Sequence, residues 1–427
     1  MHELSKMIKD DMKPALGVTE PGAIAFAVAK ARSFTKGDIK KVNVAMNSGM
    51  YKNAFTCGIP NSNEVGNVFA AALGVVAGNA DKGLESLADV TPEDNVKAQE
   101  MIDQGKITVE LSGITSRIFI EATVETEEDK AIVTIRDSHT NITKIIVNDK
   151  VELETEDEKK TEEDGGEEES HSIHKYTLQQ LYDYVTTVDI EEIRFINEAY
   201  KVNLELFHEG LENPRTTFAR QLLAINKGKE VSDDEQKTAS LMCNAAIEAR
   251  VIGLDKPAMS ITGSGAHGII ATMPLYAAYK VNGYTEEQLL RATALSYLVC
   301  MYIKEYSGRL SAFCGCAIAA GSGMACALVY LRGGTVEMMA HTLNNMASSI
   351  TGMICDGGNQ GCTMKGVAAV DAAYKSVEFA MNGIYISEVH GINGNTPEET
   401  MRNMVLIASP GMVGTEKTIV EIFEDKL

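Results

Sequence analysis

Apolar and polar positions recur with two different periods along this chain of 427 residues, and the change of period divides the chain into two parts. In the first part, residues 40–46 alternate like a strand, whereas residues 19–34 and 66–78 are apolar stretches rich in small residues, as in packed helices. Four further short runs with period-2 character are separated by charged or polar turns, at residues 107–111, 118–124, 131–136 and 144–147. Because strands joined by short turns usually pair with their neighbours, these runs predict an antiparallel meander.

Beyond residue 178 the apolar residues recur at helical spacing, and they do so to about residue 381. This spacing predicts helices at residues 189–209, 215–228, 233–252, 286–305, 316–331, 335–352 and 364–382. The change of pattern predicts an α+β fold, with a mixed α/β N-terminal domain containing a small antiparallel sheet at residues 1–150. A large all-helical domain is expected at residues 175–427.

A strongly acidic segment separates the two parts. Residues 152–169 carry eleven Asp or Glu side chains against Lys159 and Lys160. Such a run has almost no apolar surface to bury and is expected to be solvated. We therefore interpret residues 151–174 as an acidic linker or loop.

The composition is that of a soluble globular protein, with 44% hydrophobic and 23% charged residues. The net charge of −21 argues against nucleic acid or an anionic membrane as a partner. The first residues lack the pattern of a secretory signal, and no stretch approaches the roughly 18 continuous apolar residues of a membrane span. We therefore expect a cytoplasmic protein with reduced cysteines. Apolar helices rich in small residues in the second half also favour a homo-oligomer.

The segment Cys355-Asp-Gly-Gly-Asn-Gln-Gly-Cys362 places two thiols seven residues apart. Its glycines would allow a tight turn whose N–H groups face a bound anion or cluster sulfurs. Taken alone, this pattern fits a helix-to-helix turn with two buried thiols as well as it fits a metal site.

A second pair, Cys314-Gly-Cys316, follows the basic residues Lys304 and Arg309, whose charges would lower the pKa of a thiol and offset a thiolate-bound cluster. Together the segments favour an iron–sulfur cluster with one open iron, which can act as a Lewis acid. Zinc is the main competitor, although structural zinc sites usually show Cys-x₂₋₄-Cys pairs, which are absent here. The remaining thiols lie on apolar stretches and are expected in the core: Cys57, Cys243, Cys300 and Cys326.

Two turn-rich segments are candidates for substrate binding. Ser260-Ile-Thr-Gly-Ser-Gly-Ala-His267 precedes a helix, so its hydroxyl and N–H groups could hold a carboxylate at the helix N-terminus. His267 is then a candidate acid/base group, the alternative being an ordinary capped helix start. Lys52 and Asn53, followed by a polar turn at residues 58–66, are consistent with a substrate-facing loop.

Six segments match one known family in sequence and in order: Pro14-Ala-Leu-Gly-Val-Thr-Glu-Pro21, Lys52-Asn53, Gly58-Ile-Pro60, Ser260–Gly268, Tyr302-Ile-Lys-Glu-Tyr-Ser-Gly-Arg-Leu-Ser-Ala-Phe-Cys-Gly-Cys316 and Ile354-Cys-Asp-Gly-Gly-Asn-Gln-Gly-Cys362. The chain resembles the L-cysteine desulfidase family, which is similar to the α-subunit region of the iron–sulfur L-serine dehydratases. The resemblance covers essentially the whole chain, and its last two motifs are quite specific.

The resemblance implies a [4Fe–4S] cluster bound by Cys314, Cys355 and Cys362, with Cys316 as a rival for the first position. It implies a lyase that performs β-elimination on a small L-amino acid. Cysteine would give pyruvate, ammonia and sulfide, and serine would give pyruvate and ammonia. No pyridoxal phosphate is required.

The chain departs from the family pattern at two places. The family has a cysteine, thought to be the base, at the position of Val18, and Gly-Thr-Gly at the position of Asn61-Ser62-Asn63. His267 or Lys304 would then carry the proton. The alternative is a non-catalytic or re-purposed member of the family, such as a redox sensor. The candidates to bind the substrate carboxylate or to orient the cluster are Lys52, Asn53, Ser264, Lys304 and Arg309.

Overall fold

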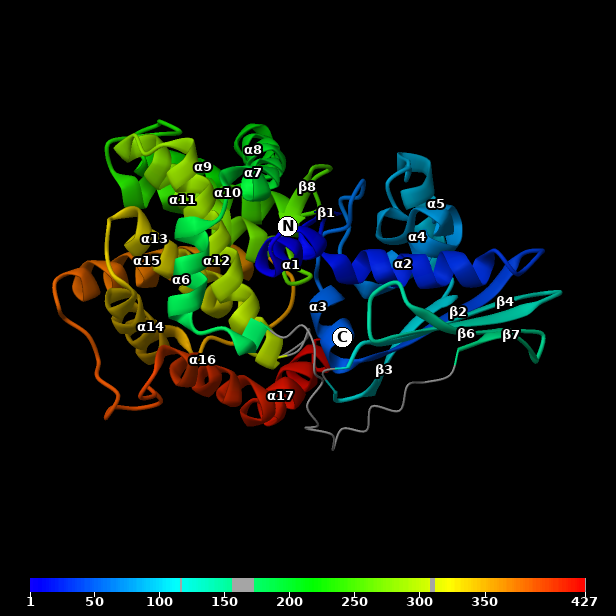
Figure 1. Ribbon diagram of the computed structural model, residues 1–427. Coiled ribbons are helices and arrows are strands. Elements are labelled where there is room, and N and C mark those ends of the chain that lie inside the picture. Colours follow the sequence, from blue (N-terminus) through cyan, green and yellow to red (C-terminus); the bar gives the residue numbers. More distant parts are fainter. Residues whose placement is uncertain (116, 156–172, 308–311, 427) are drawn as a thin grey trace.

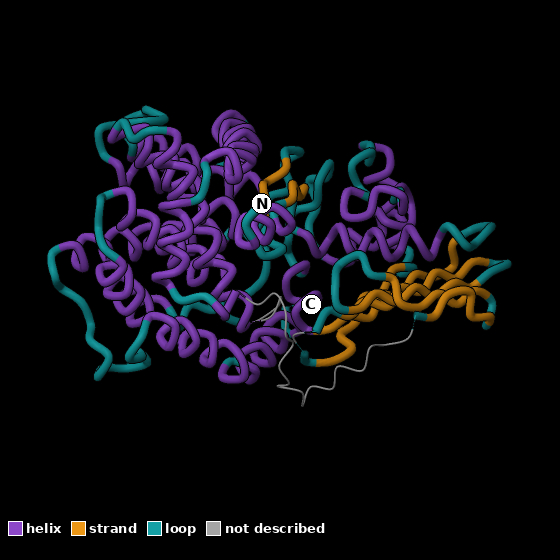
Figure 2. The backbone as a smooth tube through the Cα atoms, viewed as in Figure 1, coloured by secondary structure: helices purple, strands orange, loops and turns teal. Residues whose placement is uncertain are grey.

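A six-stranded sheet with helices over one face lies beside a larger group of helices in the computed structural model of this chain (Figure 1). The structure describes residues 1–115, 117–155, 173–307 and 312–426. Figure 2 separates the strands of one part from the helices of the other, which confirms the expected α+β fold class. Among the described residues, no helix combines the length and the apolar character needed to cross a membrane.

The N-terminal part opens with a helix and a short strand and then builds the sheet and its covering helices. Its elements are α1 (Glu3–Asp11), β1 (Lys13–Leu16), α2 (Thr19–Arg32), β2 (Ile39–Asn47), α3 (Ser48–Ala54), α4 (Asn67–Ala77), α5 (Pro92–Asp103), β3 (Ile107–Gly113), β4 (Phe119–Thr126), β5 (Lys130–Arg136), β6 (Ile142–Val147) and β7 (Lys150–Glu154).

The second part is helical apart from one short strand. Its elements are α6 (Leu178–Thr187), α7 (Ile190–Ile193), α8 (Asn197–Glu212), α9 (Phe218–Ile225), α10 (Glu235–Val251), β8 (Pro257–Ser260), α11 (Gly265–Asn282), α12 (Glu286–Ser307), α13 (Gly321–Leu331), α14 (Val336–Ile350), α15 (Gly361–Met381), α16 (Pro397–Leu406) and α17 (Val413–Glu424).

The sheet has the strand order β3-β2-β4-β5-β6-β7, so the expected meander is correct for β4 to β6 and wrong for β3, and β7 is a further strand that was not expected. Val42 of β2 pairs in parallel with Ile107 of β3 and in antiparallel with Val124 of β4. The reason is that α3, α4 and α5 connect β2 to β3, and a long crossover of this kind permits parallel pairing. β2 therefore lies between two strands that are consecutive in the sequence.

The two ends of the chain tie the parts together. Leu4 and Ile8 of α1 are buried in the core of the helical part, and β1 pairs with β8. At the other end, Phe423 of α17 stacks on Phe55, with 4.6 Å between the ring centroids. The division at residues 151–174 remains a prediction, since residues 156–172 of the acidic segment lie outside the described residues.

Helices α10 and α11 form the centre of the helical part. Residues 238–251 of α10 are all buried, so any charged side chain near its end is enclosed by protein. The start of α11 lies directly on β8, where a Cβ added to Gly268 would stand 1.8 Å from the carbonyl oxygen of Met259. This close approach fixes the position of the turn at residues 261–264 between β8 and α11.

Candidate active site

A short β-bridge brings the first two candidate thiols side by side. Phe313 pairs with Ile354, and this pairing is extended by hydrogen bonds from the Cys314 N–H to Met353 (2.9 Å) and from the Cys355 N–H to Ala312 (2.6 Å). Residues 41 positions apart in the sequence are thereby held on adjacent backbone segments.

The glycine turn between the second and third thiols is clamped onto α3. Gly357 has a φ of +101°, and a Cβ there would stand 2.4 Å from the carbonyl oxygen of Lys52. The Gly358 N–H donates to the carbonyl oxygen of Asn53 (3.0 Å). The turn leads into α15, at whose start the Cys362 thiol donates to the Gly357 carbonyl oxygen (3.4 Å). Glycine is required here because the left-handed conformation and the close backbone contact exclude a side chain.

Four thiols share this corner of the molecule, because the second member of the Cys314-Gly-Cys316 pair joins the other three. The interaction between the Cys314 and Cys316 thiols raises the pKa of Cys314 and lowers that of Cys316. Burial and the charges of Cys355 and Cys362 raise the pKa of Cys314 further. The neighbouring His267 also lowers the pKa of Cys316, so Cys316 is the member of the pair that loses its proton first.

A cavity of about 100 Å³ lies against two of these thiols, Cys316 and Cys355, at the junction of the two parts of the fold. Its lining from the N-terminal part is Thr19, Glu20, Asn53 and His139. Its lining from the helical part is Arg250, Thr262, Gly263, Ser264, His267, Lys304, Phe313, Gly315, Cys316 and Cys355. The volume admits only a small molecule.

Among the residues expected to be catalytic, His267 and Lys304 both face this cavity and are buried, at 5% and 7% exposure. The Nδ1 atom of His267 lies 2.5 Å from the Thr262 hydroxyl, and the imidazole lowers the pKa of the neighbouring Cys316. Burial lowers the pKa of Lys304, while the surrounding thiolates act in the opposite direction.

The opposite wall holds a carboxylate–imidazole pair that sequence reasoning missed. Glu20, in the first turn of α2, is 7% exposed, and its Oε1 lies 3.9 Å from His139 Nε2 and accepts a hydrogen bond from Asn53 (2.9 Å). Glu20 belongs to the Thr-Glu-Pro motif, so its position at a helix start was a usable signal. His139 lies in the turn between β5 and β6, and no local pattern marks it.

A larger cleft of about 600 Å³ leads into the small cavity and shares Thr19, His139, Thr262, Gly263 and Lys304 with it. Charged residues line its outer part, with Asp11 and Lys13 close to β1. A small polar molecule therefore has a route from the surface to the thiols between the two parts of the fold.

The remaining expected site residues divide among several places. Asn53 and Ser264 line the cavity. Lys52 is 1% exposed, and its Nζ lies 2.7 Å from Glu416 of α17, so the ammonium is engaged behind the glycine turn. Arg309 lies outside the described residues. The four thiols expected in the core, Cys57, Cys243, Cys300 and Cys326, are fully buried.

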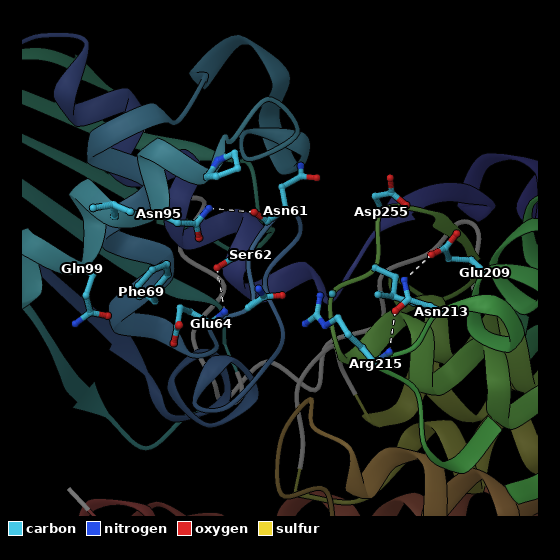
Figure 3. Close-up of a pocket in the computed structure, with 15 residues that line it drawn as sticks. Asn61, Ser62, Glu64, Phe69, Asn95, Gln99, Glu209, Asn213, Arg215 and Asp255 are labelled. Atoms are coloured by element: carbon cyan, nitrogen blue, oxygen red, sulfur yellow. Dashed lines mark hydrogen bonds between the residues drawn. The ribbon is translucent and has the colours of Figure 1, made fainter. Parts of the chain in front are cut away.

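The polar turn at residues 58–66, which follows Lys52 and Asn53, lines a cleft separate from the cavity beside the thiols. Asn61, Ser62 and Glu64 line a cleft of about 630 Å³, opposite Asn213 and Arg215 of the helical part (Figure 3). No cysteine lines this cleft. Its volume exceeds that of the cavity beside the thiols, but it lacks their chemistry, so we do not regard it as the reaction site.

Comparison with known proteins agrees with the helical architecture. The family model described as "Serine dehydratase alpha chain" matches residues 81–421. A UPF0597 protein of Clostridium botulinum is 41% identical over 424 residues, which cover 97% of each chain. UPF0597 proteins of Caldanaerobacter subterraneus subsp. tengcongensis and of Bacteroides fragilis are 36% and 34% identical, and each match covers 99% of this chain and 98% of the relative. The chain therefore belongs to the serine dehydratase alpha chain family, together with these UPF0597 proteins.

Proposed function

We propose that this protein is an iron–sulfur lyase that removes the β-substituent of a small L-amino acid, with cysteine and serine as the first substrates to try. The observation that carries the proposal is the grouping of three thiols beside a small cavity, which Cys355 lines. The β-bridge between Phe313 and Ile354 holds Cys314 and Cys355 on adjacent backbone segments, and Cys362 follows Cys355 after the glycine turn. The family assignment and the resemblance to L-cysteine desulfidases support the same reaction class.

The residues at this corner fit a [4Fe–4S] cluster. Its ligands would be Cys314, Cys355 and Cys362, with Cys316 as the rival for the first position. Within the described part of the chain, no three His, Cys, Asp or Glu side chains are placed to hold one metal ion. A cluster has a different requirement, because each thiolate binds a separate iron. When bound, the cluster would supply an open iron that acts as a Lewis acid on the leaving group.

We assign the two proton transfers of the reaction to side chains on opposite walls of the cavity. We assign removal of the α-proton to His139, oriented by the Glu20 carboxylate. Lys304, which lines the cavity and whose pKa is lowered by burial, is positioned to protonate the departing hydroxide or hydrosulfide. His267 favours the thiolate of the neighbouring Cys316, and its Nδ1 is occupied by the Thr262 hydroxyl, so we assign it no direct role as the base.

The proposed elimination balances without an oxidant or a reductant. The Cα–H bond breaks and its proton goes to the base, while the Cβ–O or Cβ–S bond breaks and the leaving group takes the electron pair. The resulting 2-aminoacrylate tautomerises to an imine, and water converts the imine to pyruvate and ammonia. Serine thus yields pyruvate and ammonia, and cysteine yields sulfide in addition.

The proposal is tested by anaerobic purification and reconstitution of the full chain. We expect bound iron, the broad visible absorption of a sulfur-ligated cluster, and ammonia release from serine, cysteine or another small L-amino acid. Protein that binds no iron after reconstitution would contradict the cluster assignment. Iron-loaded protein that releases ammonia from no small amino acid would contradict the lyase.

One observation favours a second candidate, in which the protein is a non-catalytic or re-purposed member of its family. Val18 is 5% exposed and packs against Gly358 of the glycine turn, where it cannot accept a proton. We expect the native protein, with Val18 unchanged, to release ammonia from its substrate, because the assigned base is a different residue. Activity that appears in Val18→Cys but not in the native protein or in Val18→Ser would identify a member that has lost its reaction.

A further inference from the structure

Arg250 is a buried charge for which the described residues supply no hydrogen-bonded counter-ion. Arg250 lies at the end of α10 and is 5% exposed. Its side chain forms no hydrogen bond or ion pair with another described residue, and its buried Nε atom has no hydrogen-bond partner among them. Two residues earlier, Glu248 is fully buried as well, but it accepts hydrogen bonds from the N–H groups of Thr217, Phe218 and Ala219. A guanidinium keeps its charge at all ordinary pH values, so its burial is costly unless an anion is supplied.

The start of α11 lies directly beside this guanidinium. A Cβ on Gly265 would stand 2.7 Å from Arg250 Nε, so only glycine leaves room for the arginine. The N-cap residue Ser264 makes no side-chain capping bond, and α11 extends for 18 residues. The uncapped N–H groups of its first turn and the positive end of its dipole favour an anion at this end.

Both features open onto the same cavity of about 100 Å³, which Arg250 and Ser264 line together with Glu20 and His139. The cavity has room for one small anion and a short side chain. A carboxylate matches the planar fork of a guanidinium and can accept two parallel hydrogen bonds from it.

We propose that Arg250 and the N-terminus of α11 form the binding site for the α-carboxylate of a small L-amino acid. The identity of the bound molecule as a reacting amino acid rests on the proposed lyase function. The selectivity for a carboxylate is independent of the lyase function, because it follows from the unpartnered guanidinium of Arg250 and the uncapped N-terminus of α11. The site excludes amino-acid amides and esters, which lack the negative charge.

The thiols provide the competing explanation. The charge of Arg250 contributes to lowering the pKa of Cys316, and it opposes the rise in the pKa of Cys57 that burial causes. If the arginine served only to balance a thiolate-bound cluster, its removal would change iron content and leave ligand binding in the iron-loaded protein unchanged. The two roles are therefore separable by experiment.

The test uses the reconstituted full chain and two inert probes, L-alanine and L-alaninamide, which have no β-leaving group and differ only in the carboxylate. Binding is measured by isothermal titration calorimetry. We expect the native protein to bind L-alanine at least about tenfold more tightly than the amide. Arg250→Gln should weaken L-alanine binding by about 10- to 100-fold, the range for lost charge-assisted hydrogen bonds, and abolish the discrimination.

Arg250→Lys keeps the charge without the fork and should retain part of the preference, which covers the case in which Arg250→Gln does not fold. Arg220→Gln, at an exposed position on α9, is the matched control and should bind like the native protein. Native protein that binds both probes equally, or neither, overturns the proposal. So does iron-loaded Arg250→Gln or Arg250→Lys with native affinity for L-alanine. Because the probes cannot react, absence of lyase activity leaves this test intact.

Discussion

Replacing Cys355 by alanine is expected to remove the cluster and with it nearly all lyase activity. Cys355 lies in the β-bridged segment beside Cys314 and also lines the cavity, so its loss removes a ligand at the reaction site. A bound metal centre contributes several kcal/mol to transition-state stabilisation, so we expect a fall in kcat/KM of about 1,000-fold or more. Iron content and visible absorption after anaerobic reconstitution, followed by ammonia release, measure the effect.

Cys326→Ala is the matched control. This thiol is fully buried in α13, and burial alone raises its pKa to about 12, so it has no part in the thiol group. The control should keep its iron and its activity. Retention of a full cluster by Cys355→Ala would contradict the ligand assignment.

Comparison of Cys314→Ala with Cys316→Ala shows which of the two cysteines binds the cluster. Iron content and visible absorption after anaerobic reconstitution are again measured. We expect Cys314→Ala to lose iron and Cys316→Ala to retain it, because Cys314 carries the backbone bond to Met353 that places it beside Cys355. The reverse result would make Cys316, whose thiolate is favoured by His267, the ligand.

Glu20→Gln is expected to give the second largest effect, a fall in kcat of about 100- to 10,000-fold, which is the range for loss of general acid–base catalysis. Glutamine has the shape of glutamate and can still accept the hydrogen bond from Asn53, but it cannot stabilise a positively charged His139. Iron content and the KM for the amino acid should change little. Steady-state kinetics on the reconstituted protein measures the split between kcat and KM.

Two comparisons make this prediction specific. Glu64→Gln, in the separate cleft of Figure 3, should behave like the native protein. His139→Asn should show a similar fall, and the double variant should be no slower than either single variant, because the two residues act as a unit. Effects that multiply would show that Glu20 and His139 have independent roles.

The local pattern along the chain was sufficient for the division into an α/β part and a helical part. It also indicated the glycine turn between Cys355 and Cys362, because left-handed backbone and close contacts require glycine wherever they occur. It failed at β3, where a run that looks like the first strand of a meander pairs in parallel with β2 instead. The pairing partner of a strand depends on the path of the connecting helices, which the period of the strand does not contain.

Three residues in the walls of the candidate site became apparent only from the tertiary structure. Glu20, His139 and Arg250 come from an α-helix start, a strand turn and the end of a buried helix, separated by more than 100 residues along the chain. Charged and polar residues of this kind usually face solvent, and the segments that hold these three do not mark them as buried. The packing of α10 against α11, opposite the start of α2 and the β5–β6 turn, places all three around one cavity.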